Sequence, residues 1–353
     1  MARPILALTA AAAALALSLS GAARDHQSHH HKDQAMSDPT PYAFAIHGGA
    51  GTITRDKLTA DLEADYRAKL GEALAAGQAV LADGGAATDA VIAAIQVMED
   101  SPLFNAGRGA VYTAEGRNAL DASIMDGRTL NAGAVADISR VKSPIALAAR
   151  VMTDSPHVML AGEGAEQFAR DQGQEMVSPL YFYTERRFQQ ILQVRGEDKE
   201  AVLLDHDGDD RPSKYGTVGA VALDKHGNLA AGTSTGGMTN KMYGRIGDSP
   251  IIGAGTYANN ASCAVSATGH GEYFIRATVA RDICALMEYA DLSLAEAADR
   301  MVMDKLVKMG GDGGIISVDH AGNVALVFNT PGMYRASVRE GEDAIIGIYK
   351  DDD

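Results

Sequence analysis

Hydrophobic and polar positions alternate along the chain in a way that predicts short strands and amphipathic helices. In residues 217–223 and 229–235, small and β-branched residues form two apolar runs, and Asp224-Lys225-His226-Gly227-Asn228 between them has the composition of a turn. This pattern predicts a buried β-hairpin. Residues 315–327 repeat it around a second Asp-x-x-Gly-Asn turn, which predicts another hairpin.

The rest of the pattern predicts further elements around these hairpins. Helices are expected at 59–81, 88–98, 143–151, 163–170, 272–289 and 293–308, with Thr88 capping the second and a Ser293/Glu296 capping box starting the last. Strands are expected at 42–46, in a hairpin over 110–126, and over 131–141 and 251–267. Hairpins at both ends with helix pairs between them indicate an α+β fold in which two mainly antiparallel sheets pack between helical layers.

Composition limits the class of protein. The chain has 353 residues, 46% of them hydrophobic and 22% charged, as expected for a soluble globular protein. Its formal net charge of -15, with no basic patch, argues against a nucleic-acid partner. The 38 glycines predict many tight turns.

The first residues have the layout of a secretory signal peptide. Arg3 precedes an apolar run that ends at Leu19, and the small residues Ser20-Gly21-Ala22-Ala23 follow. A membrane anchor is the alternative, but the run is shorter than the roughly 20 residues that a spanning helix needs. We therefore expect residues 1–23 to be removed and the protein to be exported, to a bacterial periplasm and without a membrane partner.

Residues 24–40 are polar and contain four histidines, His26, His29, His30 and His31. Clustered imidazoles bind Zn²⁺ or Cu²⁺, so a secreted metal-binding protein is one alternative function. A flexible, solvated leader between the signal peptide and the domain is the commoner explanation of such a segment. Cys263 and Cys284 are the only cysteines; they could pair in an oxidising compartment, but the sequence does not place them within bonding distance.

The Gly216-Thr217 pair at the start of the first hairpin is the main candidate for chemistry. Under strain, a threonine hydroxyl can attack the carbonyl that precedes it and break the chain, and the freed threonine then carries both a nucleophile and an amine base. A plain strand start is the commoner explanation of such a pair. However, residues 196–215 form an acidic segment that we expect to be a mobile linker, and it ends directly before the pair. This position favours self-cleavage.

Two further turns carry groups that fit an amino-acid substrate. Arg245 and Asp248 lie three residues apart in a glycine-rich loop, where they could bind an α-carboxylate and an α-amine. The alternative is that they pair with each other at the surface. Thr268 and Gly269 lie at a predicted strand-to-helix turn, which suits an oxyanion. His270 beside them fits a role at the pocket edge better than that of a general base.

Six motifs together resemble the plant-type L-asparaginase/isoaspartyl peptidase family of N-terminal-nucleophile (Ntn) hydrolases. They cover nearly all of 41–335, in order. The motifs are His47-Gly48-Gly49-Ala50-Gly51, Phe104-Asn105-Ala106-Gly107, residues 216–224, Thr233-Ser234-Thr235-Gly236-Gly237, residues 245–250 and Asn329-Thr330-Pro331-Gly332-Met333-Tyr334-Arg335. His270 departs from the family pattern Thr-Gly-x-Gly-Glu, where a smaller or simply polar residue is expected.

The resemblance implies a four-layer αββα sandwich and self-cleavage between Gly216 and Thr217. An α subunit of residues 41–216 and a β subunit of residues 217–353 would share one domain, and two copies of each would form an (αβ)₂ assembly. The implied substrates are L-asparagine and β-aspartyl (isoaspartyl) dipeptides, whose β-amide is hydrolysed. A glycosylasparaginase with the same mechanism is the near alternative, and residues 235–241 favour the asparaginase.

The resemblance also implies roles for individual residues. Thr217 is the nucleophile, Thr235 tunes it, and Thr268 and Gly269 with Asn105 hold the oxyanion and the surroundings of the nucleophile. Arg245, Asp248 and Gly237 bind the substrate. No cofactor is required, but a structural sodium ion is implied, held by backbone carbonyls of Met98, Glu99, Ser101, Phe104, Ala106 and Arg108.

Overall fold

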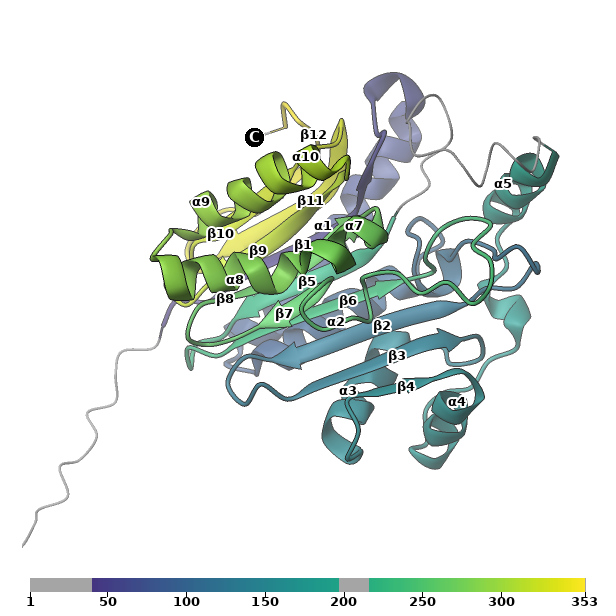
Figure 1. Cartoon of the computed structure of the whole chain (residues 1–353), viewed down its shortest axis with the longest axis horizontal. Coiled ribbons are helices and arrows are strands. Elements are labelled where there is room, and N and C mark those ends of the chain that lie inside the picture. Colours follow the sequence, from purple (N-terminus) through teal and green to yellow (C-terminus); the bar gives the residue numbers. More distant parts are fainter. Residues whose placement is uncertain (1–39, 197–215, 353) are drawn as a thin grey trace, which may run out of the picture. The chain divides into compact units, whose positions relative to one another are not determined.

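Two β-sheets form the centre of the protein in a computed structural model that describes residues 40–196 and 216–352 (Figure 1). The predicted signal peptide, the histidines of the leader and the acidic segment 197–215 lie outside the described residues. The larger sheet has eight strands in the order β12-β11-β1-β5-β6-β2-β3-β4, and the smaller has four in the order β10-β9-β8-β7. Neighbouring strands are antiparallel except for β3 and β4.

The strand bounds follow the predicted pattern in the hairpins. The larger sheet comprises β1 (Ala43–Gly51), β2 (Leu120–Asp126), β3 (Ala132–Ile138), β4 (Met159–Ala161), β5 (Val218–Leu223), β6 (Leu229–Thr235), β11 (Gly332–Arg339) and β12 (Ile345–Tyr349). The smaller sheet comprises β7 (Thr256–Ala258), β8 (Cys263–Gly269), β9 (Gly313–Asp319) and β10 (Val324–Phe328). Both predicted hairpins, β5–β6 and β9–β10, are confirmed.

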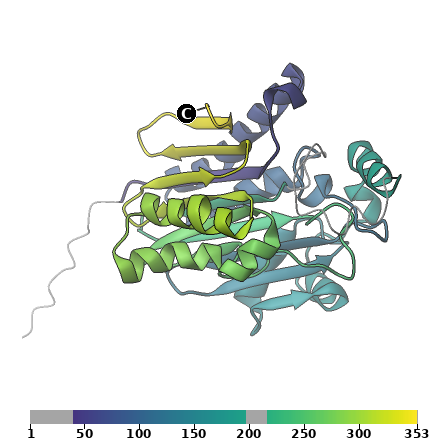
Figure 2. The same ribbon diagram turned by 45° about the horizontal axis from the view of Figure 1, so that its top comes forward.

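Helices cover the outer face of each sheet. On the larger sheet lie α1 (Ala60–Ala82), α2 (Ala87–Glu99) and α3 (Pro144–Asp154), with α4 (Gly162–Asp171) and α5 (Glu185–Gly196) further along the chain. The smaller sheet is covered by α7 (Gly271–Ala277), α8 (Val279–Ala290), α9 (Leu294–Asp299), a π-helical turn (Arg300–Leu306) and α10 (Val307–Met309) (Figure 1, Figure 2).

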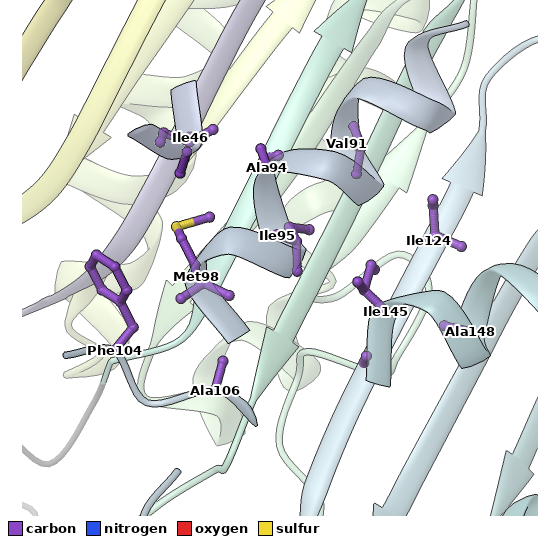
Figure 3. Packing of buried hydrophobic residues seen from close by; sticks show 14 of the residues in the cluster. Ile46, Val91, Ala94, Ile95, Met98, Phe104, Ala106, Ile124, Ile145 and Ala148 are labelled. Atoms are coloured by element: carbon purple, nitrogen blue, oxygen red, sulfur yellow. The ribbon is translucent and has the colours of Figure 1, made fainter. Parts of the chain in front are cut away.

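Three buried clusters separate the resulting four layers. The first lies between the larger sheet and its helices, where Ile46 of β1 belongs to the same cluster as Val91, Ile95 and Met98 of α2 (Figure 3). The second fills the space between the sheets, with Val221 and Ile316 among its members. The third, which includes Val265 and Ile283, lies between the smaller sheet and its helices. The layers therefore follow the order αββα, and the predicted fold is confirmed.

The alternation of side chains along β5 decides where its first residues point. Val218, Ala220 and Ala222 belong to the cluster under the helices, whereas Val221 and Leu223 belong to the cluster between the sheets. Because successive side chains of a strand point to opposite faces, residues 217 and 219 lie on the side of the second sheet. Thr217 therefore points into the space between the sheets.

Some predicted boundaries were wrong. The N-cap of α2 is Ala86 instead of Thr88, and the amide of Ala87 donates to Asp224 Oδ2 at 3.1 Å in place of a local side-chain cap. The single helix predicted over 272–289 divides into α7 and α8 at Thr278, whose φ of 49° is left-handed. The strand predicted over 251–267 is interrupted between β7 and β8, and of the hairpin at 110–126 only the Tyr112–Asn118 bridge and β2 form.

Other features were confirmed or missed. Ser293 and Glu296 form the predicted capping box. Helix α5 and strands β4, β11 and β12 were not predicted. Strands β4 and β12 are short and lie at the two edges of the larger sheet, where the periodic signal is weak, whereas β11 is a longer inner strand. Cys263 and Cys284 form a disulfide, with Cα atoms 5.4 Å apart, that joins β8 to α8. None of the helices in the described segments combines the length and apolar composition that a membrane crossing requires.

Candidate active site

A layer of polar side chains lies between the sheets, at the level of Gly219, two residues after Thr217 on β5. His47 on β1 is fully buried, and its Nε2 lies 2.9 Å from Ser266 Oγ on β8. Ser266 Oγ in turn lies 2.7 Å from Thr233 Oγ1 on β6. On β5 the same level is occupied by Gly219, where a Cβ would come within 2.0 Å of Ser266 Oγ and 2.4 Å of His47 Nε2. Only glycine leaves room for this contact.

The predicted catalytic threonines lie one layer closer to the edge of the sheets, two residues away from the first layer on each strand. Thr217 precedes Gly219, whereas Thr235 and Thr268 follow Thr233 and Ser266. Thr217 is 7% exposed, and its Oγ1 donates to Thr235 Oγ1 at 3.1 Å. Thr268, at the end of β8, accepts a hydrogen bond from the amide of Ala50 at 3.4 Å. Because residues i and i+2 of a strand share a face, the three threonines extend the layer of Thr233 and Ser266 to the edge of the sheets. The structure thus brings Thr217, Thr235 and Thr268 to one edge.

The peptide between Gly216 and Thr217 is held by close backbone contacts. The Asn105 amide donates to the Gly216 carbonyl at 3.0 Å. Gly49, with φ 114°, allows this approach, since a Cβ there would lie 2.5 Å from Gly216 Cα. His47 Nδ1 lies 3.0 Å from the carbonyl oxygen of Thr217 on the other side of the junction. Both ends of the predicted scissile residue pair are therefore fixed.

The side chain of Asn105 has fixed partners within this site. Its Nδ2 donates to the Gly237 carbonyl at 2.7 Å, and its Oδ1 accepts from the amide of Val111 at 2.9 Å. Its backbone carbonyl also accepts from the amide of Gly236 at 3.0 Å. Asn105 therefore joins the turn after Thr235 to the Gly216 junction, and its role toward the nucleophile stays a prediction.

Arg245 and Asp248 are not a surface ion pair. Arg245 instead makes two hydrogen bonds of 2.9 Å with Glu272 at the start of α7. Asp248 is 4% exposed, and its Oδ2 is buried without a hydrogen-bond partner in the structure. Burial raises the pKa of Asp248 to about 7, although the nearby Arg245 charge opposes the change. A buried carboxylate oxygen without a partner is suited to receive a substrate ammonium.

The turn at Gly271 brings the two groups together. A Cβ at Gly271 would lie 2.8 Å from Asp248 Oδ1 and 2.9 Å from Arg245 Nη2. Glu272 also lies 3.3 Å from His270 Nε2. Although burial alone would raise the pKa of Glu272, hydrogen bonds from His270 and Arg245 lower it below its usual range. His270 therefore contacts the Arg245 site through Glu272, and its pocket-edge role stays a prediction.

The backbone of the loop after α2 is tightly packed. A Cβ at Gly107 would lie 2.3 Å from the Glu99 carbonyl oxygen, and one at Gly109 would lie 1.9 Å from the Phe104 carbonyl oxygen. Glycine at both positions keeps these carbonyl oxygens free of side-chain crowding, and oxygen is the donor type that a hard cation such as sodium takes. The carboxylate of Glu99 points elsewhere, to the hydroxyls of Ser143 and Ser234 at 2.6 Å each. Within 40–196 and 216–352, no three His, Cys, Asp or Glu side chains are grouped to hold a metal.

A cavity of about 540 Å³ reaches the junction from the side of Gly216. Gly48, Asn105 and Gly216 line one part of it, and Arg186 and Arg187 line another. Thr217, Arg245 and Asp248 are not among its lining residues. The cavity is therefore distinct from the Arg245–Asp248 site.

Sequence reasoning missed the residues that support the site. His47 was assigned only to a glycine-rich turn, and Thr233, Ser266 and Glu272 were given no role. The period of two that places Thr233 below Thr235 is visible in the sequence. The meeting of His47 with Ser266 is not, because these residues lie on different sheets and are 219 positions apart.

An αββα sandwich with a buried Gly-Thr pair at the head of a central strand defines the class of N-terminal-nucleophile hydrolases. Comparison with known proteins identifies the family: a family model described as Asparaginase matches residues 40–348, and the chain belongs to this family.

Similar proteins are found in bacteria and plants. An isoaspartyl peptidase of Escherichia coli (strain K12) is 55% identical over 310 residues, which cover 87% of this chain and 96% of that protein. An isoaspartyl peptidase of Salmonella typhimurium is 56% identical over 310 residues, covering 87% and 98% of the two chains. A probable isoaspartyl peptidase/L-asparaginase 2 of Arabidopsis thaliana is 42% identical over 329 residues, covering 88% and 99%.

Proposed function

We propose that the protein is a self-processing threonine hydrolase that cleaves the β-amide of L-asparagine and of β-aspartyl dipeptides and releases L-aspartate. The hydrogen bond between Thr217 Oγ1 and Thr235 Oγ1, at the head of a buried strand directly after Gly216, is the observation that carries the proposal. Membership of the asparaginase family and the names of its similar proteins support the same activity.

Self-cleavage begins with attack of Thr217 Oγ on the Gly216 carbonyl carbon. The peptide C–N bond breaks as the new ester forms, and the Thr217 nitrogen gains a proton to become an amine. Water then hydrolyses the ester, giving a Gly216 carboxylate and a free Thr217. The amide of Asn105 would stabilise the negative oxygen that develops at Gly216 during the attack, because it already donates to this carbonyl.

The mature site would repeat this chemistry on the substrate. The Thr217 amine takes the hydroxyl proton, Oγ attacks the β-carbonyl, and the leaving amine departs with a proton. Water cleaves the resulting β-aspartyl ester on Thr217. Arg245 would bind the α-carboxylate and Asp248 the α-ammonium, while Thr268 and Gly269 would hold the oxyanion. Gly237, whose carbonyl is fixed by Asn105, would line the substrate side of the turn.

A denaturing gel with N-terminal sequencing of every band tests the nucleophile. Purified protein should give two chains, the smaller beginning Thr-Val-Gly-Ala, while Thr217→Ala should remain one chain. Thr217→Ser is the matched control because it retains a hydroxyl, and it should still be cut. A single wild-type band after prolonged incubation would refute the proposal.

Substrate choice is tested by comparing kcat/KM for L-asparagine, a β-aspartyl dipeptide and a glycosylated asparagine. We expect hydrolysis of the first two. Much faster hydrolysis of the glycosylated substrate would favour the glycosylasparaginase alternative. For the metal-binding alternative, Zn²⁺ is titrated into full-length protein and into protein lacking residues 1–40; tight binding retained by the shortened protein would be required to support it.

Assembly, location and ion content are separate parts of the proposal. We propose an (αβ)₂ assembly of chains 41–216 and 217–353, to be checked by native mass spectrometry. Export to the periplasm is supported by the composition of residues 1–23 and by the Cys263–Cys284 disulfide, and cell fractionation tests it. The carbonyls of residues 98–108 would hold a sodium ion that stiffens the loop carrying Asn105. Exchange of Na⁺ for a large organic cation should then lower the thermal midpoint.

A further inference from the structure

Buried polar side chains around His47 connect the nucleophile to strand β6 and to the smaller sheet. His47 Nδ1 contacts the Thr217 carbonyl at 3.0 Å, and Nε2 contacts Ser266 Oγ at 2.9 Å. Beyond Ser266, Thr233 Oγ1 lies 2.6 Å from Thr256 Oγ1 and 3.1 Å from the Gly255 carbonyl oxygen.

The tautomer of His47 follows from these partners. A carbonyl oxygen only accepts, so Nδ1 must carry a proton to bond with Thr217. Burial lowers the pKa of His47 to about 3, so the ring is neutral and Nε2 must accept. The Ser266 hydroxyl therefore donates to Nε2 and is left to accept from Thr233. Since each hydroxyl has one proton, Thr233 donates in its 2.7 Å contact with Ser266 and accepts in its 2.6 Å contact with Thr256.

We propose that His47, Ser266, Thr233 and Thr256 form a positioning network that fixes Thr217 through its carbonyl. The inference rests on the proposed role of Thr217. Once the Gly216–Thr217 bond is cut, Thr217 is a chain end and loses the covalent restraint on its amino side. A hydrogen bond to its carbonyl from a fully buried ring then limits the orientation of Oγ and of the amine.

The glycine at position 219 indicates that the His47–Ser266 contact is specific and that these side chains do more than fill the space between the sheets. Its lack of a Cβ creates the gap through which His47 and Ser266 meet. Thr233, Thr256 and Ser266 are fully buried, so each hydroxyl depends on protein partners for its hydrogen bonds. A network in which every member is bonded defines one geometry.

His47→Asn and His47→Gln provide a matched test. The asparagine amide nitrogen can take the place of Nδ1 and reach the Thr217 carbonyl, whereas the glutamine nitrogen takes the place of Nε2 and reaches Ser266. With kcat normalised to the amount of cut chain, His47→Gln should lose about 100-fold in kcat with little change in KM. His47→Asn should lie much closer to wild type.

One outcome of the His47 comparison would refute the positioning role. If His47 only fills space, glutamine should be tolerated at least as well as the smaller asparagine, and a kcat of His47→Gln equal to or above that of His47→Asn refutes the positioning role. A second test, by NMR, remains available if both His47 variants fail to fold, because it reads the proton positions of His47 in the wild-type protein.

Histidine ¹⁵N NMR of the wild-type protein gives a readout independent of activity. His47 should show a protonated Nδ1 and an unprotonated Nε2 from pH 5 to 8. A protonated Nε2, or titration within this range, would contradict the network. These results are separable from failure of the proposed function, because an uncut chain would already be seen on the gel.

Discussion

Replacing Asp248 by asparagine should stabilise the fold at neutral and alkaline pH while it removes substrate binding. The carboxyl group is 4% exposed, Oδ2 has no hydrogen-bond partner in the structure, and burial raises its pKa from 3.8 to about 7. Such a difference corresponds to about 4 kcal/mol of free energy. Because the folded protein prefers the protonated acid, the wild type should lose this stability as the pH rises from about 4 to about 7.

Asparagine carries no charge at any pH, so its advantage over aspartate should be absent near pH 4 and should grow to at most about 4 kcal/mol above pH 7. The catalytic effect has the opposite sign. Loss of one partner of a buried charge pair costs about 2–5 kcal/mol, which corresponds to a fall in kcat/KM of about 30- to 5,000-fold. Both effects have one cause: the buried Asp248 carboxylate destabilises the free protein but is the group that binds the substrate ammonium.

Urea denaturation at pH 4.5, 6 and 8.5 measures the stability difference. It is done in the Thr217→Ala background, which is expected to remain a single chain. Kinetics are measured on the self-cleaved Asp248→Asn protein with L-asparagine and a β-aspartyl dipeptide. Asp83→Asn, at an exposed position, is the matched control and should change neither quantity. A stability difference that is independent of pH, or an unchanged kcat/KM, would refute the assigned environment and role of Asp248.

Three further predictions concern other parts of the site. Arg245→Ala should leave self-cleavage intact but raise KM for both substrates, since a charge-assisted pair worth about 2–5 kcal/mol is lost; an unchanged KM would rule out carboxylate binding by this residue. Gly49→Ala should slow self-cleavage in a gel time course because its Cβ would lie 2.5 Å from Gly216 Cα, whereas Gly164→Ala, with open space around it, should not. Burial raises the pKa of Glu99 to about 7, so Glu99→Gln should gain stability relative to wild type between about pH 4.5 and 7; a constant difference would contradict this.

The sequence alone determined most of the local elements and indicated the candidate site residues. The two apolar runs at 217–223 and 229–235 predicted the β5–β6 hairpin, because strand preference and the composition of the turn between them are local properties. The Gly216-Thr217 pair indicated self-cleavage, and the Arg245/Asp248 spacing indicated binding of an amino acid. Both could be recognised because the residues of each motif are close together in the sequence. Boundaries failed at Thr88 and Thr278, where the outcome depends on contacts such as that between Ala87 and Asp224, 137 residues away.

Only the tertiary structure decided how these motifs meet. The register that pairs His47 with Gly219 comes from the alignment of β1 with β5, and Ser266 arrives from the other sheet. Likewise, Arg245 pairs with Glu272 because β8 ends where α7 begins, which leaves Asp248 buried and without that partner. Strand register and sheet stacking are set by hydrophobic contacts summed over the whole core, and no local pattern of residues contains that information.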